Sequence, residues 1–349
     1  MLMVIFGAGA SYDSVPTYPP GSPAYVYGGD SSNNHFRPPL ANELFENRPM
    51  FAEAILKYPE CQPIVPRLRT LRKESLEEAL ADILEQSKSS LRALKQLAAV
   101  RCYLQRVIRE SEDGWRTVAK GVTNYKSLLN LIEIAHTGNE PVCLVTFNYD
   151  TLLEDALYDF GLPITSIDDY TKKHPYYRIF KLHGSINWAR EVQIQLQTTS
   201  RSAEAVIREL IERANEMHIL ERYVFARDRV IGLVGGIATF PAIAVPVEKK
   251  TSFECPAELL KTLADLLPEV TRMLVIGWRG TEMHFLELLE QYLRKGIQLY
   301  IVAGRKAYAD TTSVQIHRAL VNKSPYSSVD PGGFTDFILD RRAERFLQR

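Results

Sequence analysis

The chain has 349 residues, of which 46% are hydrophobic, so it is long enough to bury a large core. Lysine plus arginine and aspartate plus glutamate each number 42, and this balance gives no electrostatic footprint for direct nucleic-acid binding. No apolar run approaches the roughly 20 residues of a membrane span, and the four cysteines form no Cys-x-x-Cys pair of the kind that holds zinc. These features predict a soluble, cytoplasmic protein with no metal site and no membrane partner.

The N-terminal third of the chain divides into three expected segments. Met3 to Phe6 is a short apolar run bounded by Gly7, which is typical of a buried parallel strand. Residues 13–40 are rich in Pro and Gly, so we expect a long loop that covers whatever binds after the first strand. Residues 75–137 carry apolar positions at helical spacing, which predicts a helical insertion or subdomain.

The rest of the chain alternates between strand and helix signals. Strand signals resume in four short apolar runs, at residues 142–147, 178–182, 273–276 and 298–302. A second small module is expected over residues 199–250, opening with a helical stretch that runs to His218. Such alternation predicts an α/β fold with a Rossmann-like parallel sheet, flanking helices and a helical insertion, within one domain over residues 1–349.

A glycine turn follows the first expected strand. Gly7-Ala8-Gly9-Ala10-Ser11 would open a helix, an arrangement that holds a pyrophosphate through backbone N–H groups and the helix dipole. Tyr12 occupies the place of the third glycine of the dinucleotide fingerprint. An ordinary strand-to-helix turn explains these glycines equally well, so both interpretations stay open.

Polar side chains stand at the ends of two later strands. Asn148 and Asp150 follow Val142 to Thr146, and carboxyl ends of parallel strands line the ligand crevice of open α/β sheets. An alternative is that Asn148 caps the helix expected from Thr151 to Leu157, since Asn is among the best capping residues. His183 ends the next run, where an imidazole can act as a general base near neutral pH. Together these side chains predict catalysis on a nucleotide.

Four segments occur in the order seen in sirtuin-like proteins: Gly7-Ala8-Gly9-Ala10-Ser11, Thr146-Phe147-Asn148-Tyr149-Asp150, Leu182-His183-Gly184 and Ile276-Gly277-Trp278. The chain resembles the bacterial sirtuin-like branch of NAD hydrolases that act as antiphage defence effectors. The resemblance implies a sirtuin-like catalytic domain in which Asn148 and Asp150 contact the nicotinamide ribose and the attacking water, and His183 is the catalytic base. It also implies NAD contacts from Gly7, Ala8, Gly9, Ser11, Thr146, Phe147, Gly277, Trp278, Arg279 and Glu282.

The chain departs from the sirtuin pattern in two places. It lacks the paired cysteines that hold the structural zinc of sirtuin deacylases, so the resemblance favours NAD cleavage over deacylation. Arg279 stands where such proteins usually carry serine, and Glu282 replaces the usual aspartate. An arginine can pair with a diphosphate. For Glu282 and His284, a solvated helix N-terminus is an equal alternative to a cofactor contact.

The resemblance implies that NAD is the substrate, that water is the acceptor and that the products are nicotinamide and ADP-ribose. It further implies an NAD-depleting effector of an antiviral, abortive-infection system, activated through oligomerisation or through a separately encoded sensor, ATPase or nucleotide-processing partner. One alternative is a regulatory subunit that binds NAD or ADP-ribose without turnover. Others are a protein deacylase or ADP-ribosyltransferase and, last, a conventional dehydrogenase.

Overall fold

The computed structural model describes residues 1–21, 31–65, 68, 73–135, 141–172, 174, 176–198, 202–246, 253–323 and 325–348. Parts of three expected segments therefore lie outside the described residues: 22–30 of the loop, 136–137 of the helical region, and 199–201 and 247–250 of the second module.

One of the two sheets is parallel and has six strands, in the order β10-β9-β8-β1-β2-β3. Its strands are β1 (Leu2–Phe6), β2 (Val142–Thr146), β3 (Tyr177–Lys181), β8 (Arg272–Ile276), β9 (Gln298–Val302) and β10 (Tyr326–Asp330). In the register of the sheet, Ile5 lies opposite Val145 on one side and Val275 on the other. The central strands β1 and β2 are buried along their whole length because both faces of the sheet are covered. The predicted Rossmann-like α/β fold is confirmed.

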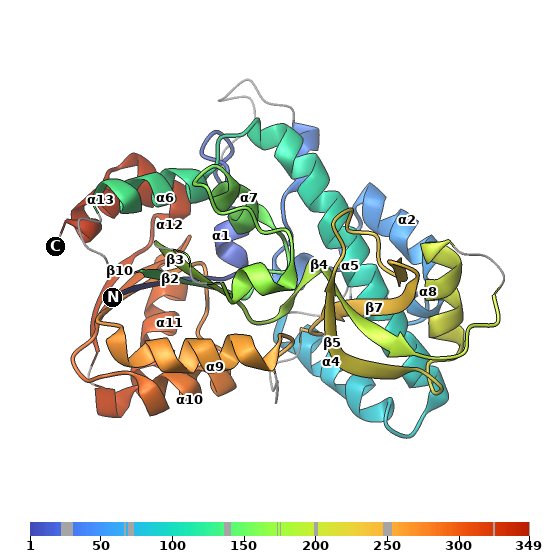
Figure 1. Cartoon of the computed structure of the whole chain (residues 1–349). Helices are drawn as coiled ribbons and strands as arrows, with labels where there is room; N and C mark the ends of the chain where they lie inside the picture. The colour runs from blue at the N-terminus through green and yellow to red at the C-terminus, as the bar shows by residue number, and fades with distance from the viewer. Residues whose placement is uncertain are drawn as a thin grey trace.

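Helices cover both faces of this sheet (Figure 1). On one face lie α6 (Asn124–Ala135), α12 (Gly333–Leu339) and α13 (Arg342–Leu347), together with the short α1 (Ala8–Tyr12) and α7 (Leu152–Tyr158). On the other lie α9 (Ala257–Leu266), α10 (Met283–Tyr292) and α11 (Lys306–Ala319). Short 3₁₀ turns span Ser31–Phe36, Ala41–Glu43, Pro59–Cys61, Ile167–Tyr170, Leu267–Glu269 and Val321–Lys323.

A second, antiparallel sheet has the order β5-β4-β7-β6. Its strands are β4 (Gly184–Gln193), β5 (His218–Phe225), β6 (Leu233–Val234) and β7 (Ile237–Ile243). Gly235 and Gly236 both have positive φ and form the two-residue hairpin turn between β6 and β7. The helix α8 (Ala203–Glu212) precedes β5, so the expected helical stretch up to His218 is wrong at its end, where His218 begins a strand.

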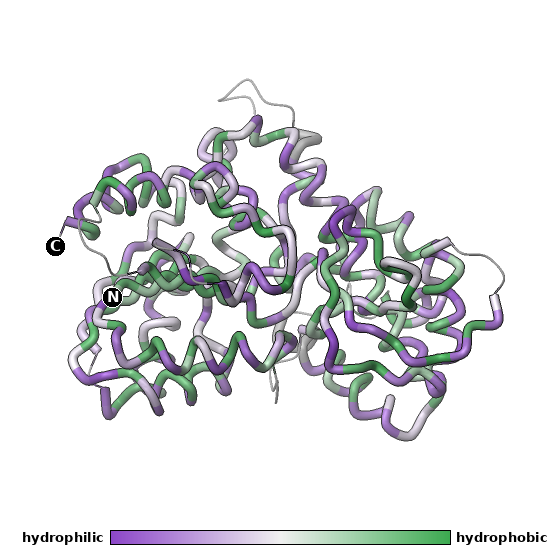
Figure 2. Tube along the Cα trace, viewed as in Figure 1, coloured by the Kyte–Doolittle hydropathy of each residue, from purple (hydrophilic) through white to green (hydrophobic). Residues whose placement is uncertain are grey.

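The 29-residue α5 (Leu91–Ala119) packs on the second sheet, and α2 (Pro49–Lys57) and α4 (Lys73–Gln86) pack against α5. Figure 2 shows hydrophobic residues along the strands of the parallel sheet and alternating colours along the helices. Two hydrophobic cores result, one around each sheet, and α5 belongs to both. Its Trp115 packs in the first core, and its segment from Leu97 to Ile108 packs in the second.

Candidate functional site

A cavity of about 600 Å³ lies at the carboxyl ends of the parallel strands. Residues that follow five strands line it, as expected for the crevice of an open α/β sheet. These residues are Gly7 after β1, Asn148 after β2, His183 after β3, Gly277 after β8 and Gly304 after β9. The four segments that carried the sequence prediction therefore meet at one place.

Of the predicted site residues, all but Thr146 line this cavity: Gly7, Ala8, Gly9, Ser11, Phe147, Asn148, Asp150, His183, Gly277, Trp278, Arg279 and Glu282. Thr146 instead lies buried in the last position of β2, where its hydroxyl accepts the backbone N–H of Asn148 at 3.1 Å. The segment predicted as a cover contributes Pro20, Gly21, Pro38 and Pro39 to the wall.

The segments Gly7–Ser11 and Ile276–Trp278 lie against each other. Gly7 N donates to the carbonyl of Ile276 at 3.0 Å, and Gly9 N donates to that of Gly277 at 3.1 Å. A Cβ at Gly7 would lie 2.5 Å from Cα of Trp278, and one at Gly9 would lie 2.8 Å from Cα of Gly277. These glycines therefore allow two strand ends to touch, and the N–H groups of Gly7 and Gly9 already have acceptors within the protein. Sequence reasoning could not see this pairing.

Asn148 is the centre of a buried polar cluster. Its Nδ2 donates to the carbonyl of Gly7 and to Ser11 Oγ, both at 2.9 Å, and lies 3.2 Å from Tyr125 Oη. The two hydroxyls of Ser11 and Tyr125 are themselves 2.9 Å apart. The N-cap of α7 is Thr151, so the alternative interpretation of Asn148 as a helix cap is wrong. Its buried Oδ1 has no hydrogen-bond partner among the described residues.

Asp150 lies beside this cluster and lines the same cavity. Burial raises the pKa of its carboxyl, while the ammonium of Lys181 and a hydrogen bond from Ser11 oppose that shift. Its Oδ1 accepts the backbone N–H of Leu152 at 3.2 Å. Lys181, which is fully buried, donates to the backbone carbonyl of Asp150 and pairs with Glu154 at 3.0 Å.

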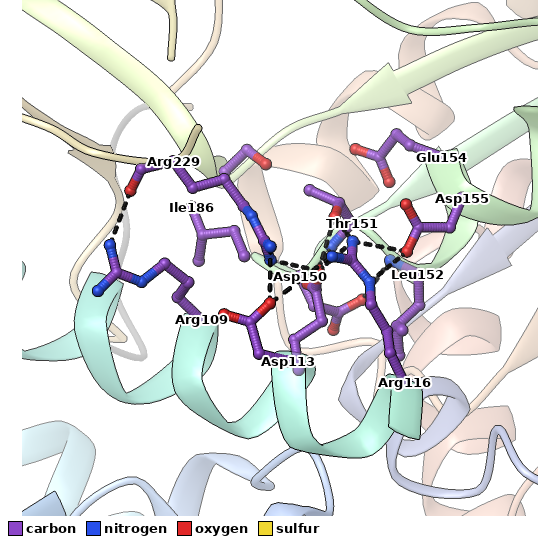
Figure 3. Close-up of polar contacts among 12 residues, drawn as sticks. Arg109, Asp113, Arg116, Asp150, Thr151, Leu152, Glu154, Asp155, Ile186 and Arg229 are labelled. Atoms are coloured by element: carbon purple, nitrogen blue, oxygen red, sulfur yellow. Dashed lines mark hydrogen bonds and ion pairs between the residues drawn. The ribbon is translucent and has the colours of Figure 1, made fainter. Parts of the chain in front are cut away.

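A buried carboxylate on α5 holds the turn after Asp150. Glu112 accepts the backbone N–H of Thr151 at 2.6 Å and its hydroxyl at 2.8 Å. It also pairs with Arg116 at 2.5 Å and with Arg229 at 3.0 Å. Burial raises the pKa of Glu112, and Arg116 opposes this shift most strongly. Figure 3 shows Arg116 and Arg229 converging on this turn from different elements.

This network was missed at the level of sequence. Glu112 and Arg116 have the i, i+4 spacing of an ordinary solvated helix pair, and nothing in the residue order marks them as buried. Arg229 adopts a left-handed backbone conformation with φ of 55°. Its carbonyl accepts Gln105 Nε2 and Arg109 Nη1, both at 3.0 Å. The second sheet is thereby tied to the turn that carries Asp150.

His183 occupies an aromatic part of the cavity and is 3% exposed. Its ring centroid lies 4.8 Å from that of Phe147 and 6.4 Å from that of His284. Trp278 stacks on Phe147 at 5.3 Å, and its indole N–H donates to Glu282. Glu282 therefore orients the tryptophan, whatever further contact it makes to a ligand.

The backbone after His183 joins the two sheets. The carbonyl of His183 accepts the N–H of Ala244 at 3.0 Å, and Gly184 has φ of +80°. A Cβ at Gly184 would lie 1.9 Å from the carbonyl oxygen of Ala242, so only glycine fits there. The hydroxyl of Tyr149 donates to the carbonyl of Ala244 at 2.8 Å. Both Tyr149 and His183 are thus positioned by the strand end of β7.

Within the part of the chain that the structure describes, no group of three or more His, Cys, Asp or Glu side chains could hold a metal ion. Cys61, Cys102, Cys143 and Cys255 are free and buried. Among the same residues, no helix combines the length and the apolar character that crossing a bilayer requires.

The family model described as "SIR2-like domain" matches residues 142–319, which is just over half of the chain. The matched part includes Asn148, Asp150, His183 and the segment from Gly277 to Glu282. No curated protein matches the sequence.

Proposed function

Because the chain belongs to the SIR2-like domain family, we propose that it is an NAD hydrolase that releases nicotinamide and ADP-ribose. Family membership supports the use of NAD, and the choice of water as acceptor is the further step. The cavity volume of about 600 Å³ lies within the usual range for sites of small molecules and cofactors.

One observation carries the proposal: Asn148 is a buried amide with a partly satisfied side chain. Its Nδ2 already donates to Gly7 and Ser11, whereas its Oδ1 lacks a partner among the described residues. Leaving a buried acceptor unpaired costs about 1–3 kcal/mol. A ribose hydroxyl bound in this cavity would donate to that oxygen, so the amide is arranged as half of a sugar-binding contact.

The reaction follows from this placement. The bond between C1′ of the ribose and the nicotinamide nitrogen breaks, and its electron pair leaves with the ring, which departs as a neutral molecule. Positive charge on the ribose then makes C1′ an acceptor for water, as in glycoside cleavage. In this mechanism Asn148 orients the ribose, and His183 takes the proton that water loses as its oxygen bonds to C1′.

The surroundings of His183 support that role. The rings of Phe147, Trp278 and Phe285 pack against each other, and Phe147 lies against His183, so we expect this aromatic wall to exclude bulk water. Exclusion of water limits the acceptor to a single positioned molecule and strengthens the electrostatic interactions inside the site. Asp150 is held by Ser11 and Leu152, and we assign it to positioning of the turn that carries Asn148.

The biological role proposed with this activity is that of an NAD-depleting effector in a bacterial antiviral system that acts by abortive infection. Such an activity has to be silent until infection, so we propose control in the cytoplasm by oligomerisation or by a separately encoded sensor or ATPase. The sequence resemblance to antiphage sirtuin-like proteins supports this role.

The test is release of nicotinamide and ADP-ribose from NAD by the purified chain, alone and mixed with the proteins encoded beside it. His183→Ala should lower the rate by about 10²–10⁴-fold, the range for loss of a general base, and Asn148→Ala should also lower it because the ribose contact is lost. His218→Ala is the matched control, because His218 is an exposed histidine on β5 of the second sheet. Tight NAD binding without release in any mixture would instead support the regulatory subunit. Removal of the acyl group from acylated peptides would support a deacylase.

A further inference from the structure

Two arginines line the cavity near the ends of β8 and β9. Arg279 follows β8, and Arg305 lies between β9 and α11. Both guanidinium groups lie over the ring of Tyr308, at 5.4 Å and 6.0 Å from its centroid. One aromatic ring at the cavity wall therefore holds two cations, an arrangement that favours an anionic ligand.

Neither arginine forms an ion pair with any of the described residues, whereas the carboxylates of the cavity all have other partners. Asp13 accepts from Thr335, Glu43 pairs with Arg48, Asp150 accepts from Leu152, and Glu282 accepts from Trp278. Arg279 is half-buried and Arg305 is exposed, so both guanidinium groups are free to pair with an anion that enters the cavity.

The order of the strands says which part of a dinucleotide would meet these arginines. From β1 the chain adds β2 and β3 on one side of the sheet, and it then crosses over to add β8, β9 and β10 on the other side. The strand order therefore reverses between β1 and β8. Dinucleotides lie across such a point, with one nucleotide on each side. Asn148 and His183 mark the nicotinamide side under the proposed function, so the adenosine side lies at the ends of β8 and β9.

In dinucleotide sites, an acidic side chain binds the 2′-hydroxyl of the adenosine ribose of NAD, and an arginine accommodates the 2′-phosphate of NADP. No carboxylate lies in the segment Ala303 to Arg305 that joins β9 to α11. Gly304 leaves open space beside Arg305, since a Cβ there would meet nothing within 4 Å. The N-terminus of the 14-residue α11 adds further positive potential.

We propose that Arg305 binds the 2′-phosphate of NADP and that Arg279 binds the diphosphate that NADP and NAD share. The consequence is a preference for NADP over NAD. This inference rests on the proposed function for its substrate class. Binding of the adenosine half can be measured whether or not the protein cleaves the dinucleotide. A guanidinium suits the task because its planar fork makes two parallel hydrogen bonds to a phosphate.

The first test measures binding without catalysis. Adenosine 2′,5′-bisphosphate and adenosine 5′-monophosphate are titrated into the full chain by calorimetry. The bisphosphate should bind about tenfold more tightly, as one charge-assisted contact predicts. Arg305→Gln should remove that difference and leave the monophosphate unchanged, whereas Arg279→Gln should weaken both ligands.

Lys306→Gln is the matched control, because it removes the same charge from the neighbouring exposed position, which does not line the cavity. It should keep the preference for the bisphosphate. Equal binding of the two nucleotides to the wild-type chain would overturn the inference. So would a loss of preference in Lys306→Gln equal to that in Arg305→Gln.

The second test is nicotinamide release from NADP and from NAD, compared as kcat/KM. Arg305→Gln should raise KM for NADP by about tenfold and leave that for NAD unchanged. If neither substrate is cleaved while the bisphosphate preference persists, the hydrolase proposal fails and the phosphate site stands. Cleavage of NAD at a higher kcat/KM than NADP would overturn the preference and leave the hydrolase in place.

Discussion

Gly7, Gly9 and Gly277 bring the ends of β1 and β8 into contact. Backbone atoms of Gly277 and Trp278 occupy the space that a Cβ at Gly7 or Gly9 would need. A flexible side chain could move out of the way, but these backbone atoms cannot. The contact places Trp278 against Phe147, and Phe147 in turn against His183. The shape of the aromatic wall therefore depends on the absence of two side-chain atoms.

Gly7→Ala should destabilise the protein by about 2–3 kcal/mol, the upper part of the range for an overpacked site. The matched variant is Gly304→Ala, which lies in the same cavity wall but where an added Cβ meets nothing within 4 Å. We expect its free energy of unfolding to stay within about 0.5 kcal/mol of the wild type. Urea unfolding curves of both variants decide the matter, and an equal loss of stability in the two would contradict the contact as described.

The glycine turn also illustrates what residue order can and cannot predict. Its position after a buried strand and beside a cavity follows from the pattern of Met3 to Gly7. The partner of Gly9 is Gly277, and no local pattern joins residues so far apart in the chain. Asn148 shows the same limit: a helix cap was an open alternative for it, and only the positions of Gly7 and Ser11 separate the two interpretations.

The helix α5 supplies the buried carboxylate that fixes the turn after Asp150. The side chain of Glu112 is fully buried, and two arginines and two groups of Thr151 compensate its charge. Removing one member of a buried ion network leaves the others uncompensated, which is more costly than the net stabilisation that the intact network gives.

Glu112→Ala should lower the free energy of unfolding by about 3–5 kcal/mol. Asp113→Ala is the control on the next residue: Asp113 also pairs with Arg229, at 2.6 Å, but its side chain is 47% exposed. The exposed pair should contribute only about 0–1 kcal/mol. Thermal and urea unfolding measure both, and a loss for Asp113→Ala as large as that for Glu112→Ala would rule out the buried network as the reason.

The apolar central strands were easier to predict from the sequence than the polar edge strand and the second sheet. Val142 to Thr146 and Met273 to Ile276 are continuous apolar runs, and both are strands of the parallel sheet. The edge strand β10 was missed because its sequence, Tyr-Ser-Ser-Val-Asp, is mostly polar and four of its five residues are exposed. Residues 199–218 were expected to be helical, yet β5 begins at His218 and pairs with β4.

For the whole molecule, the carboxylates around α5 and α7 make stability depend on pH. Asp150, Glu112 and Asp155 each have a raised pKa, with burial as the first cause. For Asp155, burial and the neighbouring Glu112 raise the pKa to about 6 from its ordinary value of 3.8, although Arg116 opposes the shift. The folded state thus binds this proton more tightly than the unfolded chain does.

A raised folded-state pKa means that the stabilisation by the bound proton is fully present below the unfolded pKa of 3.8 and is lost as pH rises through about 6. Asp155→Asn keeps a hydrogen-bond acceptor for Arg116 but has no proton to lose. We therefore expect the variant to show a smaller fall in Tm than the wild type between pH 4 and pH 7, a window set by these two pKa values. A larger fall in the variant would contradict the sign of the shift.

The membership of α5 in both hydrophobic cores has a consequence for how the chain can be divided. With 29 residues, the helix is about 43 Å long at 1.5 Å per residue. Cutting away the second sheet would expose the apolar face from Leu97 to Ile108 to water. Cutting away the helix would remove Trp115 from the first core and Glu112 from the turn beside Asp150. We therefore expect the two sheets and the helices around them to unfold in a single transition.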